Sequence, residues 1–375
     1  MPSVSRLLVA LIIVGVMASP ALSQSASWKH AGVARGDGQS SGGPGKESSG
    51  PRKEQARAGQ ALNERINAST IGLAAGRIEG APLQFAAELA RVLDDGDNMR
   101  ILPIVTRGAF DNVYDLLYLR GVDAAIVYGD VLDHFKSKPE FAEAAQHINF
   151  LFSLFPSEVH VFVRPEINSL QDLAGKVVNF NTPGTAAAFT GPIVLKQLGI
   201  EVRQTFIPHS VAMEKMRQSD EVAATFWVSS KPLVAFLKGK WPEGFKFLPI
   251  EYTDKLEYYS PGYLEASDYP NLIKNGQKIP TISVPTVFAV FDWPKGTDRY
   301  ERLVRMVSYL FDRLPRLQND PGYHEKWKDV NLAATVPGWT RFAPMQDRLD
   351  KGMAGETRRI GSEDQSSTRT VHHAD

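Results

Sequence analysis

The sequence predicts an α/β fold of two lobes that close on each other as a clamshell. Three observations predict it. Short runs of β-forming residues alternate with amphipathic helical stretches over residues 68–349. The chain has 375 residues, more than a single hydrophobic core usually serves. Two extended segments, residues 159–164 and 282–291, separate one strand-helix series from the other, so the chain crosses between the lobes twice.

The first residues have the pattern of an export signal. Residues 7–18 form an apolar run after Arg6, and small residues lead to a cleavage point after Ser23. The run has 12 residues, whereas a membrane-spanning helix needs about 20. We expect a signal peptide at residues 1–23 and a periplasmic protein, with a retained anchor as the alternative.

Two further segments have compositions that do not form a core. Residues 24–67 are rich in Gly, Ser and charged residues, as in GDGQSSGGPGKESSGPRKEQ, and the sequence predicts a flexible leader there. Residues 350–375 are similarly polar, which predicts a disordered tail.

The first lobe is expected to comprise residues 68–163 and 284–349. Strand-helix-strand repeats require parallel strands with helices on the faces of the sheet. Gly96 and Gly121 follow the first two helical stretches, as residues that end helices do. The expected strands are residues 69–73, 100–105 and 124–128, and the expected helices are 83–93, 110–117, one from Val131, and 300–314.

The second lobe is expected at residues 164–283 and repeats the alternation. Residues 177–180 predict a buried strand that stops at the polar turn Asn181-Thr182-Pro183-Gly184-Thr185. A helix follows to Leu198, then a strand at 222–227 and a helix at 232–237.

Polar, aromatic and basic residues follow the strands of both lobes. Open α/β sheets bind ligands at the carboxyl ends of their strands, and the start of a helix there can receive an anion. We therefore expect a ligand-binding cleft between the lobes. The predicted site residues are Gly76, Arg77, Arg107, Asn112, Tyr128, Asp130, Asn181, Thr182, Gly184, Thr185 and Trp227.

Several of these residues have a structural alternative. Arg107 would grip a carboxylate with its planar guanidinium, or pair with Asp111 or Asp130. Thr185 would contact ligand or only cap its own helix. Tyr128 and Trp227 would stack on ligand or belong to the core.

Composition argues against other function classes. The formal net charge is zero, and no basic stripe with interleaved aromatics suggests a nucleic-acid partner. The chain has no cysteine, which excludes thiol catalysis and Cys-ligated zinc. Ser40 lies in a GQSSG motif with no strand before it, and no histidine pair has metal-binding spacing. We expect neither an enzyme nor a metal or cofactor.

Three blocks of sequence resemble the TAXI solute receptors, the periplasmic binding proteins of TRAP-type transporters. They are ILPIVTRGAFDNVYDLLYLRGVDAAIVYGDVL, SLQDLAGKVVNFNTPGTAAAF and YHEKWKDVNLAATVPGWTRF, and the resemblance covers residues 70–349. It implies a type 2 periplasmic-binding fold, a small organic acid or amino acid such as glutamate as ligand, and TRAP permease subunits as partners.

The first loop departs from the family pattern. It reads GLAAGRIEGAPLQF, with Ala81 and Pro82 where the resemblance implies threonine and tyrosine. The leading hypothesis is a receptor that delivers its ligand to a permease. The altered loop and the long leader also allow a degenerate receptor that acts as a sensor or assembly partner. An enzyme on the same fold is the third possibility.

Overall fold

A computed structural model describes residues 51–78 and 80–352 of the chain. The predicted signal peptide, residues 24–50 of the predicted leader and residues 353–375 of the predicted tail lie outside this range. The chain divides into a unit of residues 1–54 and a unit of residues 55–375. Only the start of helix α1 (Pro51–Ser69) is described in the first unit, and the fold below belongs to the second.

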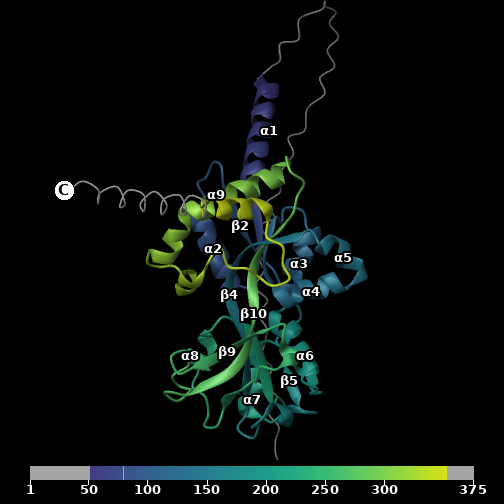
Figure 1. The fold of residues 1–375 in the computed structure, drawn as a ribbon, viewed down its shortest axis with the longest axis vertical. Helices are drawn as coiled ribbons and strands as arrows, with labels where there is room; N and C mark the ends of the chain where they lie inside the picture. Colours follow the sequence, from purple (N-terminus) through teal and green to yellow (C-terminus); the bar gives the residue numbers. More distant parts are fainter. Residues whose placement is uncertain (1–50, 79, 353–375) are drawn as a thin grey trace, which may run out of the picture. The chain divides into compact units, whose positions relative to one another are not determined.

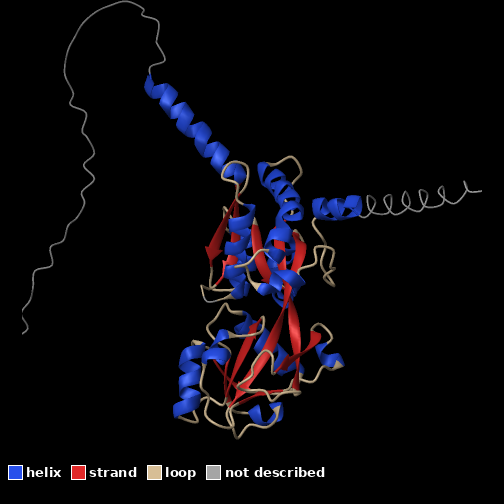
Figure 2. Ribbon diagram, turned by 90° about the vertical axis from the view of Figure 1, so that its left-hand side faces the viewer, coloured by secondary structure: helices blue, strands red, loops and turns tan. Residues whose placement is uncertain are grey.

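One mixed sheet of ten strands forms the framework of the described residues. Its order is β2-β1-β3-β10-β4-β7-β5-β6, with β8 paired to β4 and β9 to β10. The central strands β4 (Ile148–Val163) and β10 (Lys278–Phe291) run antiparallel and continue from one group of elements into the other (Figures 1 and 2). They are the two expected crossings, so the predicted α/β fold of two lobes with two inter-lobe crossings is confirmed.

The first lobe is built on three parallel strands beside the crossing pair. Helices cover both faces of this part of the sheet (Figure 2). The helix α5 was not expected from sequence. The elements are β1 (Thr70–Gly76), α2 (Ala81–Leu93), β2 (Arg100–Val105), α3 (Ala109–Tyr118), β3 (Ala124–Tyr128), α4 (Gly129–Ser137), α5 (Pro139–Ala145), α9 (Asp298–Asn319), the 3₁₀ helix η3 (Glu325–Asp329) and a helix over 343–352.

The second lobe repeats the arrangement with shorter strands. β5, β6 and β7 are parallel, and β7 pairs with β4. Of the elements of this lobe, the sequence predicts only the strands β5 and β7 and the helices α6 and α8. The elements are η1 (Leu170–Leu173), β5 (Val177–Asn179), α6 (Ala186–Gln197), β6 (Arg203–Thr205), α7 (His209–Gln218), β7 (Ala224–Ser229), α8 (Val234–Lys238), β8 (Lys246–Leu248), η2 (Asp254–Leu256) and β9 (Ser260–Glu265).

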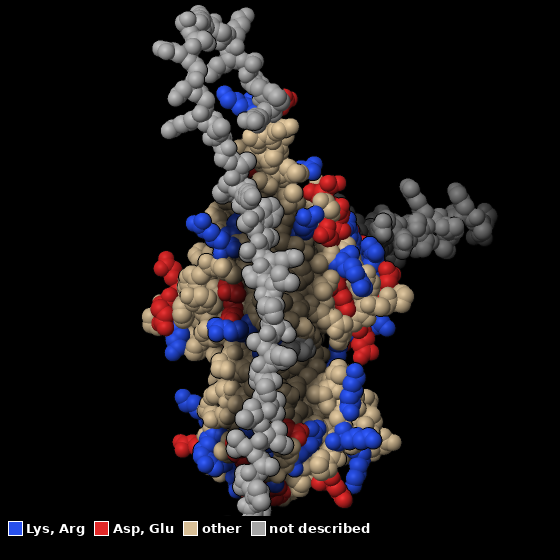
Figure 3. Space-filling model, turned by 180° about the vertical axis from the view of Figure 1, so that it is seen from behind, with Lys and Arg blue, Asp and Glu red and all other residues tan. Residues whose placement is uncertain are grey.

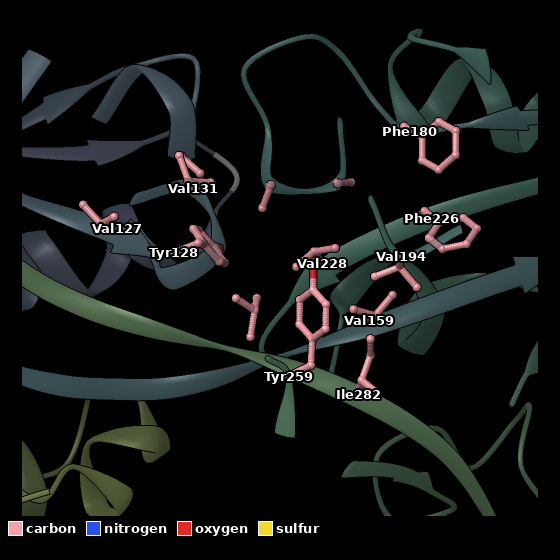
Figure 4. Packing of buried hydrophobic residues seen from close by; sticks show 14 of the residues in the cluster. Val127, Tyr128, Val131, Val159, Phe180, Val194, Phe226, Val228, Tyr259 and Ile282 are labelled. Carbon is pink, nitrogen blue, oxygen red and sulfur yellow. The ribbon is translucent and has the colours of Figure 1, made fainter. Parts of the chain in front are cut away.

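A continuous hydrophobic cluster joins the two lobes along the crossing strands. Figure 4 shows side chains of both lobes packed around Val159 of β4 and Ile282 of β10. Val131 comes from the first lobe, and Phe180 and Phe226 come from the second. Because β4 and β10 are continuous through this cluster, the lobe limits at residues 163 and 283 stay a prediction.

Helix α1 corrects the prediction of a flexible leader over residues 24–67. Residues 51–67 are helical because they are rich in Ala, Arg, Gln and Glu, all good helix formers, whereas the residues before them are rich in Gly and Ser. Gln60 donates to Glu64 at 3.0 Å, one turn apart. At the end of the helix, the guanidinium groups of Arg302 and Arg305 donate to the carbonyls of Asn67 and Ala68. The predicted tail likewise begins within a helix, which extends to residue 352.

The surface carries charges of both signs. In Figure 3, Lys and Arg side chains are interspersed with Asp and Glu over the described residues of the face shown. Among the described helices, none combines the length and the apolar composition required to cross a membrane.

Candidate ligand-binding site

A cavity of about 330 Å³ lies between the two lobes. It opens at the carboxyl ends of β1, β3 and β7 and just beyond β5, at Gly76, Tyr128, Ser229 and Asn181. Both lobes therefore present the same edge of their parallel strands to one space, which is where open α/β sheets place their ligands.

Four helices begin at this cavity. They are α2 and α3 of the first lobe and α6 and α7 of the second, each ten residues or longer. The first N–H groups of a helix have no partner within it, and the helix dipole is positive at that end. The cavity is therefore suited to an anion. The residues that line it at these helix starts are Gly80, Pro82, Gly108, Ala109, Thr185, Ala186, Ala187, Pro208, His209 and Ser210.

Arg77 adds a cation to the same space. It follows β1, lines the cavity and donates from Nη1 to Thr182 Oγ1 of the other lobe at 3.0 Å. A guanidinium carries its charge at any physiological pH and matches the two oxygens of a carboxylate. Arg77 thus brings a charged group to the cavity and links the two lobes.

An aromatic pair forms part of the wall in the second lobe. The His209 ring stacks on Trp227 at 3.6 Å with an interplanar angle of 7°. His209 Nδ1 lies 3.0 Å from Thr225 Oγ1. Burial, with a smaller contribution from the nearby Arg77 charge, lowers the pKa of His209 to about 3. The ring is therefore neutral at physiological pH, and it covers one face of Trp227.

Asn112, Tyr128 and Asn181 line the cavity from both lobes. Asn112 is fully buried, donates to Ile126 O at 2.7 Å and accepts from Thr106, so its amide holds α3 against β3. Burial raises the pKa of Tyr128 to about 12, which keeps the phenol neutral. Asn181 has a φ of 63°, a backbone conformation that Asn tolerates better than most residues.

The structure therefore brings together most of the residues expected from sequence. Thr185 lines the cavity and also caps α6, since its Oγ1 accepts from Ala188 N at 3.3 Å. The helix cap is therefore observed, and a contact between Thr185 and ligand stays a prediction. The predicted residues that line the cavity are Gly76, Arg77, Asn112, Tyr128, Asn181, Thr185 and Trp227.

Arg107 corrects the prediction that its guanidinium faces the cleft. Its side chain is 78% exposed and pairs with Asp111, at 2.6 Å from Nε to Oδ2 and 3.0 Å from Nη2 to Oδ1. The reason is local: α3 begins at Ala109, so Asp111 sits in its first turn, where an acid is favoured, four residues from Arg107. This pair is one of the alternatives that the sequence left open.

Asp130, Thr182 and Gly184 also lie outside the cavity lining, and each makes a contact between the lobes instead. Thr182 accepts from Arg77, as above. The Gly184 carbonyl accepts from Phe110 N at 3.3 Å. Asp130 is buried, and its Oδ2 accepts from Thr190 Oγ1 at 2.6 Å and from Tyr259 OH at 3.4 Å. These three residues hold the lobes together beside the cavity.

The cavity residues of α7 were not identified from the sequence. Pro208, His209 and Ser210 precede a helix whose apolar side chains, Ala212, Met213 and Met216, give only a weak periodicity. Proline followed by two polar residues before an apolar repeat is a signal for a helix start, and it would have found them.

His209, which lines the cavity beside Ser210, has its Nδ1 on Thr225 instead of on a nucleophile. Within the described part of the chain, no group of His, Cys, Asp and Glu is arranged to hold a metal ion.

No family model matches the chain. Among solved structures, it is similar to the arginine-bound form of truncated ArgBP from T. maritima, with 14% identity, 67% of this chain and 99% of that chain covered, and a TM-score of 0.37. It is similar to the amino acid ABC transporter substrate-binding protein AbpA from Streptococcus pneumoniae, bound to L-arginine, with 12% identity, coverages of 67% and 92%, and a TM-score of 0.39. It is also similar to the BenM effector binding domain with benzoate, with 13% identity, coverages of 68% and 98%, and a TM-score of 0.36.

Proposed function

We propose that the protein is an exported solute-binding receptor that captures a small organic acid or amino acid between its lobes. The observation that carries this proposal is the cavity itself, where four helix N-termini and the Arg77 guanidinium meet. The ligand contacts Arg77, Asn181 and Thr185 with its carboxylate, and Tyr128 and Trp227 enclose its remainder. A ligand touched by both lobes stabilises their closed arrangement, which a partner protein then recognises.

The partner in this proposal is a TRAP-type permease, and the location is the periplasm. The support is the resemblance of residues 70–349 to TAXI receptors together with the signal-like residues 1–23. The test is uptake of radiolabelled ligand by proteoliposomes that hold the permease subunits. Uptake that requires the receptor supports the proposal, and uptake that is the same without it contradicts this part.

Differential scanning fluorimetry against a library of organic acids and amino acids tests the binding function. We expect a saturable rise in melting temperature with a subset of carboxylates and none with the matching amides or amines. A library without any such shift would favour the second candidate, a degenerate receptor that acts as a sensor or assembly partner. That candidate is favoured by Pro82, which lines the cavity where the resemblance implies a side chain with a hydroxyl.

A further inference from the structure

The two ring nitrogens of His209 have different surroundings. Nδ1 lies 3.0 Å from the Oγ1 of Thr225, which is fully buried in β7 and does not line the cavity. Nε2 has no hydrogen-bond partner among the described residues and is not shielded from solvent. Because His209 lines the cavity, Nε2 is the ring nitrogen that a ligand there can reach.

A chain of hydrogen bonds determines which of these nitrogens carries the hydrogen. The backbone N–H of Ile207 donates to Oδ1 of Asn179 at 3.1 Å, so the amide of Asn179 turns its Nδ2 toward Thr225. This Nδ2 donates to Thr225 Oγ1 at 3.2 Å. The hydroxyl of Thr225 therefore accepts from Asn179, and it donates its own hydrogen to Nδ1 of His209. Since Nδ1 accepts, the hydrogen of the neutral ring is on Nε2.

The ring of His209 is held neutral and in one plane. Burial, with a smaller contribution from the charge of Arg77, lowers the pKa of His209 to about 3. His209 is also the first residue of α7, where the positive end of the helix opposes a second proton. Trp227, stacked on one face of the imidazole, fixes the plane of the ring. The Nε2–H group is therefore an oriented, uncharged donor at physiological pH.

We propose that His209 is a specificity residue of the cavity whose Nε2–H donates to an oxygen of the ligand, an inference that rests on the proposed function and deepens it. A carboxylate or carbonyl oxygen accepts this bond, whereas an N–H group of a ligand at that place would set two donors against each other. A donor left unpaired in a site that excludes water weakens binding. The ligand class is thus a small acid that presents an acceptor oxygen to His209, and Asn179 and Thr225 are positioning residues.

Nitrogen-15 NMR of the histidine rings in the ligand-free full chain tests the tautomer. The protonated and the bare nitrogen of a neutral imidazole have well separated chemical shifts, and the variant His209→Gln identifies the His209 signals by their loss. We expect a protonated Nε2 and a bare Nδ1 from about pH 5 to about pH 8. A hydrogen on Nδ1 in this range, alone or in an imidazolium, would overturn the inference without any ligand being needed.

The same spectra show whether the donor meets a ligand. Phenylacetate, 2-oxoglutarate and glutamate are added separately as probes, and the melting temperature is measured in parallel. We expect each probe that raises the melting temperature also to move the Nε2 signal of His209. Stabilisation without such a movement overturns the role of His209 and leaves the receptor standing. Absence of stabilisation by all three probes counts against the proposed function itself.

Two variants separate the donor from the ring. His209→Phe keeps an aromatic ring against Trp227 without the donor, whereas His209→Gln brings an amide N–H near the position of Nε2. In calorimetric titration with the stabilising probe among the three, His209→Phe should bind about tenfold more weakly and His209→Gln within about threefold of wild type. If His209→Phe fails to fold because the Thr225 hydroxyl is left unpaired, the double variant with Thr225→Val removes that hydroxyl. Equal affinity of wild type and a folded variant without the donor would contradict the contact.

Discussion

Arg77 and Arg107 both follow strands of the first lobe, but only Arg77 lines the cavity. The difference comes from the residues after them. Arg107 has Asp111 one helical turn ahead, whereas Arg77 precedes a loop and reaches across to Thr182. Two similar strand ends thus give one ion pair on the surface and one cationic group in the site.

The matched variants Arg77→Gln and Arg107→Gln separate these roles. Arg77→Gln should weaken carboxylate binding by roughly tenfold to a hundredfold, because a charged hydrogen bond contributes about 1.5–3 kcal/mol. Arg107→Gln should change affinity by less than about twofold, since exposed ion pairs contribute little. Calorimetric titration with a carboxylate that raises the melting temperature of the wild type measures both. Equal losses in the two variants would contradict the assignment of Arg77.

Asp130 is a buried carboxylate placed where the lobes meet. One oxygen accepts from Thr190 and Tyr259, and the other has no hydrogen-bond partner among the described residues. Burial, with a smaller contribution from the negative charge of Asp133, raises the pKa of Asp130 from 3.8 to about 6. The folded protein therefore holds this proton over a pH range in which the unfolded chain releases it.

Asp130 should consequently make stability depend on pH. Its contribution is full below pH 3.8 and is lost as the pH rises through about 6. The neutral variant Asp130→Asn should be more stable than wild type near pH 8, by a few kcal/mol at most, and the difference should vanish near pH 4. Urea denaturation at a series of pH values measures it. A difference that is the same at every pH would show that Asp130 is not protonated in the folded state.

At the scale of elements, the starts of α3 and α6 touch each other across the cleft. Gly108 has a φ of 137°, and a Cβ added to it would lie 2.7 Å from Gly184 O and 3.1 Å from Thr185 Cα. Gly184 has a φ of 90°, and a Cβ added to it would lie 3.2 Å from the Cβ of Arg107. Two glycines thus let two helix starts approach closely enough to share one anion.

Gly108→Ala should force the lobes apart. Gly96→Ala is the matched control, because Gly96 also has a positive φ, 81°, but no atom lies within 4 Å of an added Cβ. Gly96→Ala should lose about 1–2 kcal/mol of stability through backbone strain, and Gly108→Ala at least as much, because its φ of 137° and ψ of −154° lie in a region that essentially only glycine adopts. Only Gly108→Ala should show a larger radius of gyration in small-angle X-ray scattering. The same radius for both would mean that the glycine contact does not set the spacing of the lobes.

The sequence predicts the elements to the extent that each has a strong apolar period. The strand at 124–128 and the helix that ends at Leu93 are placed correctly because the strand is buried throughout and the helix has a regular buried face. The strand at 100–105 is also placed correctly, although only Ile101 in it is buried. Helix α7 was missed because its buried face is short, and α1 because its composition was averaged with the Gly-rich residues before it. The strand ends predict most cavity residues, but they do not show that Arg107 pairs with Asp111 at the surface while Arg77 lines the cavity.

At the scale of the molecule, the contacts that join the two lobes lie around the cavity. Arg77 to Thr182, Phe110 to Gly184 and Thr190 to Asp130 all join one lobe to the other around the same space. The hydrophobic cluster along β4 and β10 continues between the lobes behind them. We therefore expect ligand binding in the cavity to be coupled to the arrangement of the lobes.

The central claim is that this cavity holds the carboxylate of its ligand at Arg77, with the remainder of the ligand enclosed by Tyr128 and Trp227. A crystal of the protein grown with para-bromophenylacetate tests it directly, because anomalous scattering locates the bromine without a prior model of the ligand. We expect one bromine peak in the cavity beside Tyr128 and Trp227, with the carboxylate on the Arg77 guanidinium. Bromine elsewhere on the molecule, or a cavity without it at concentrations that saturate binding in solution, would contradict the account.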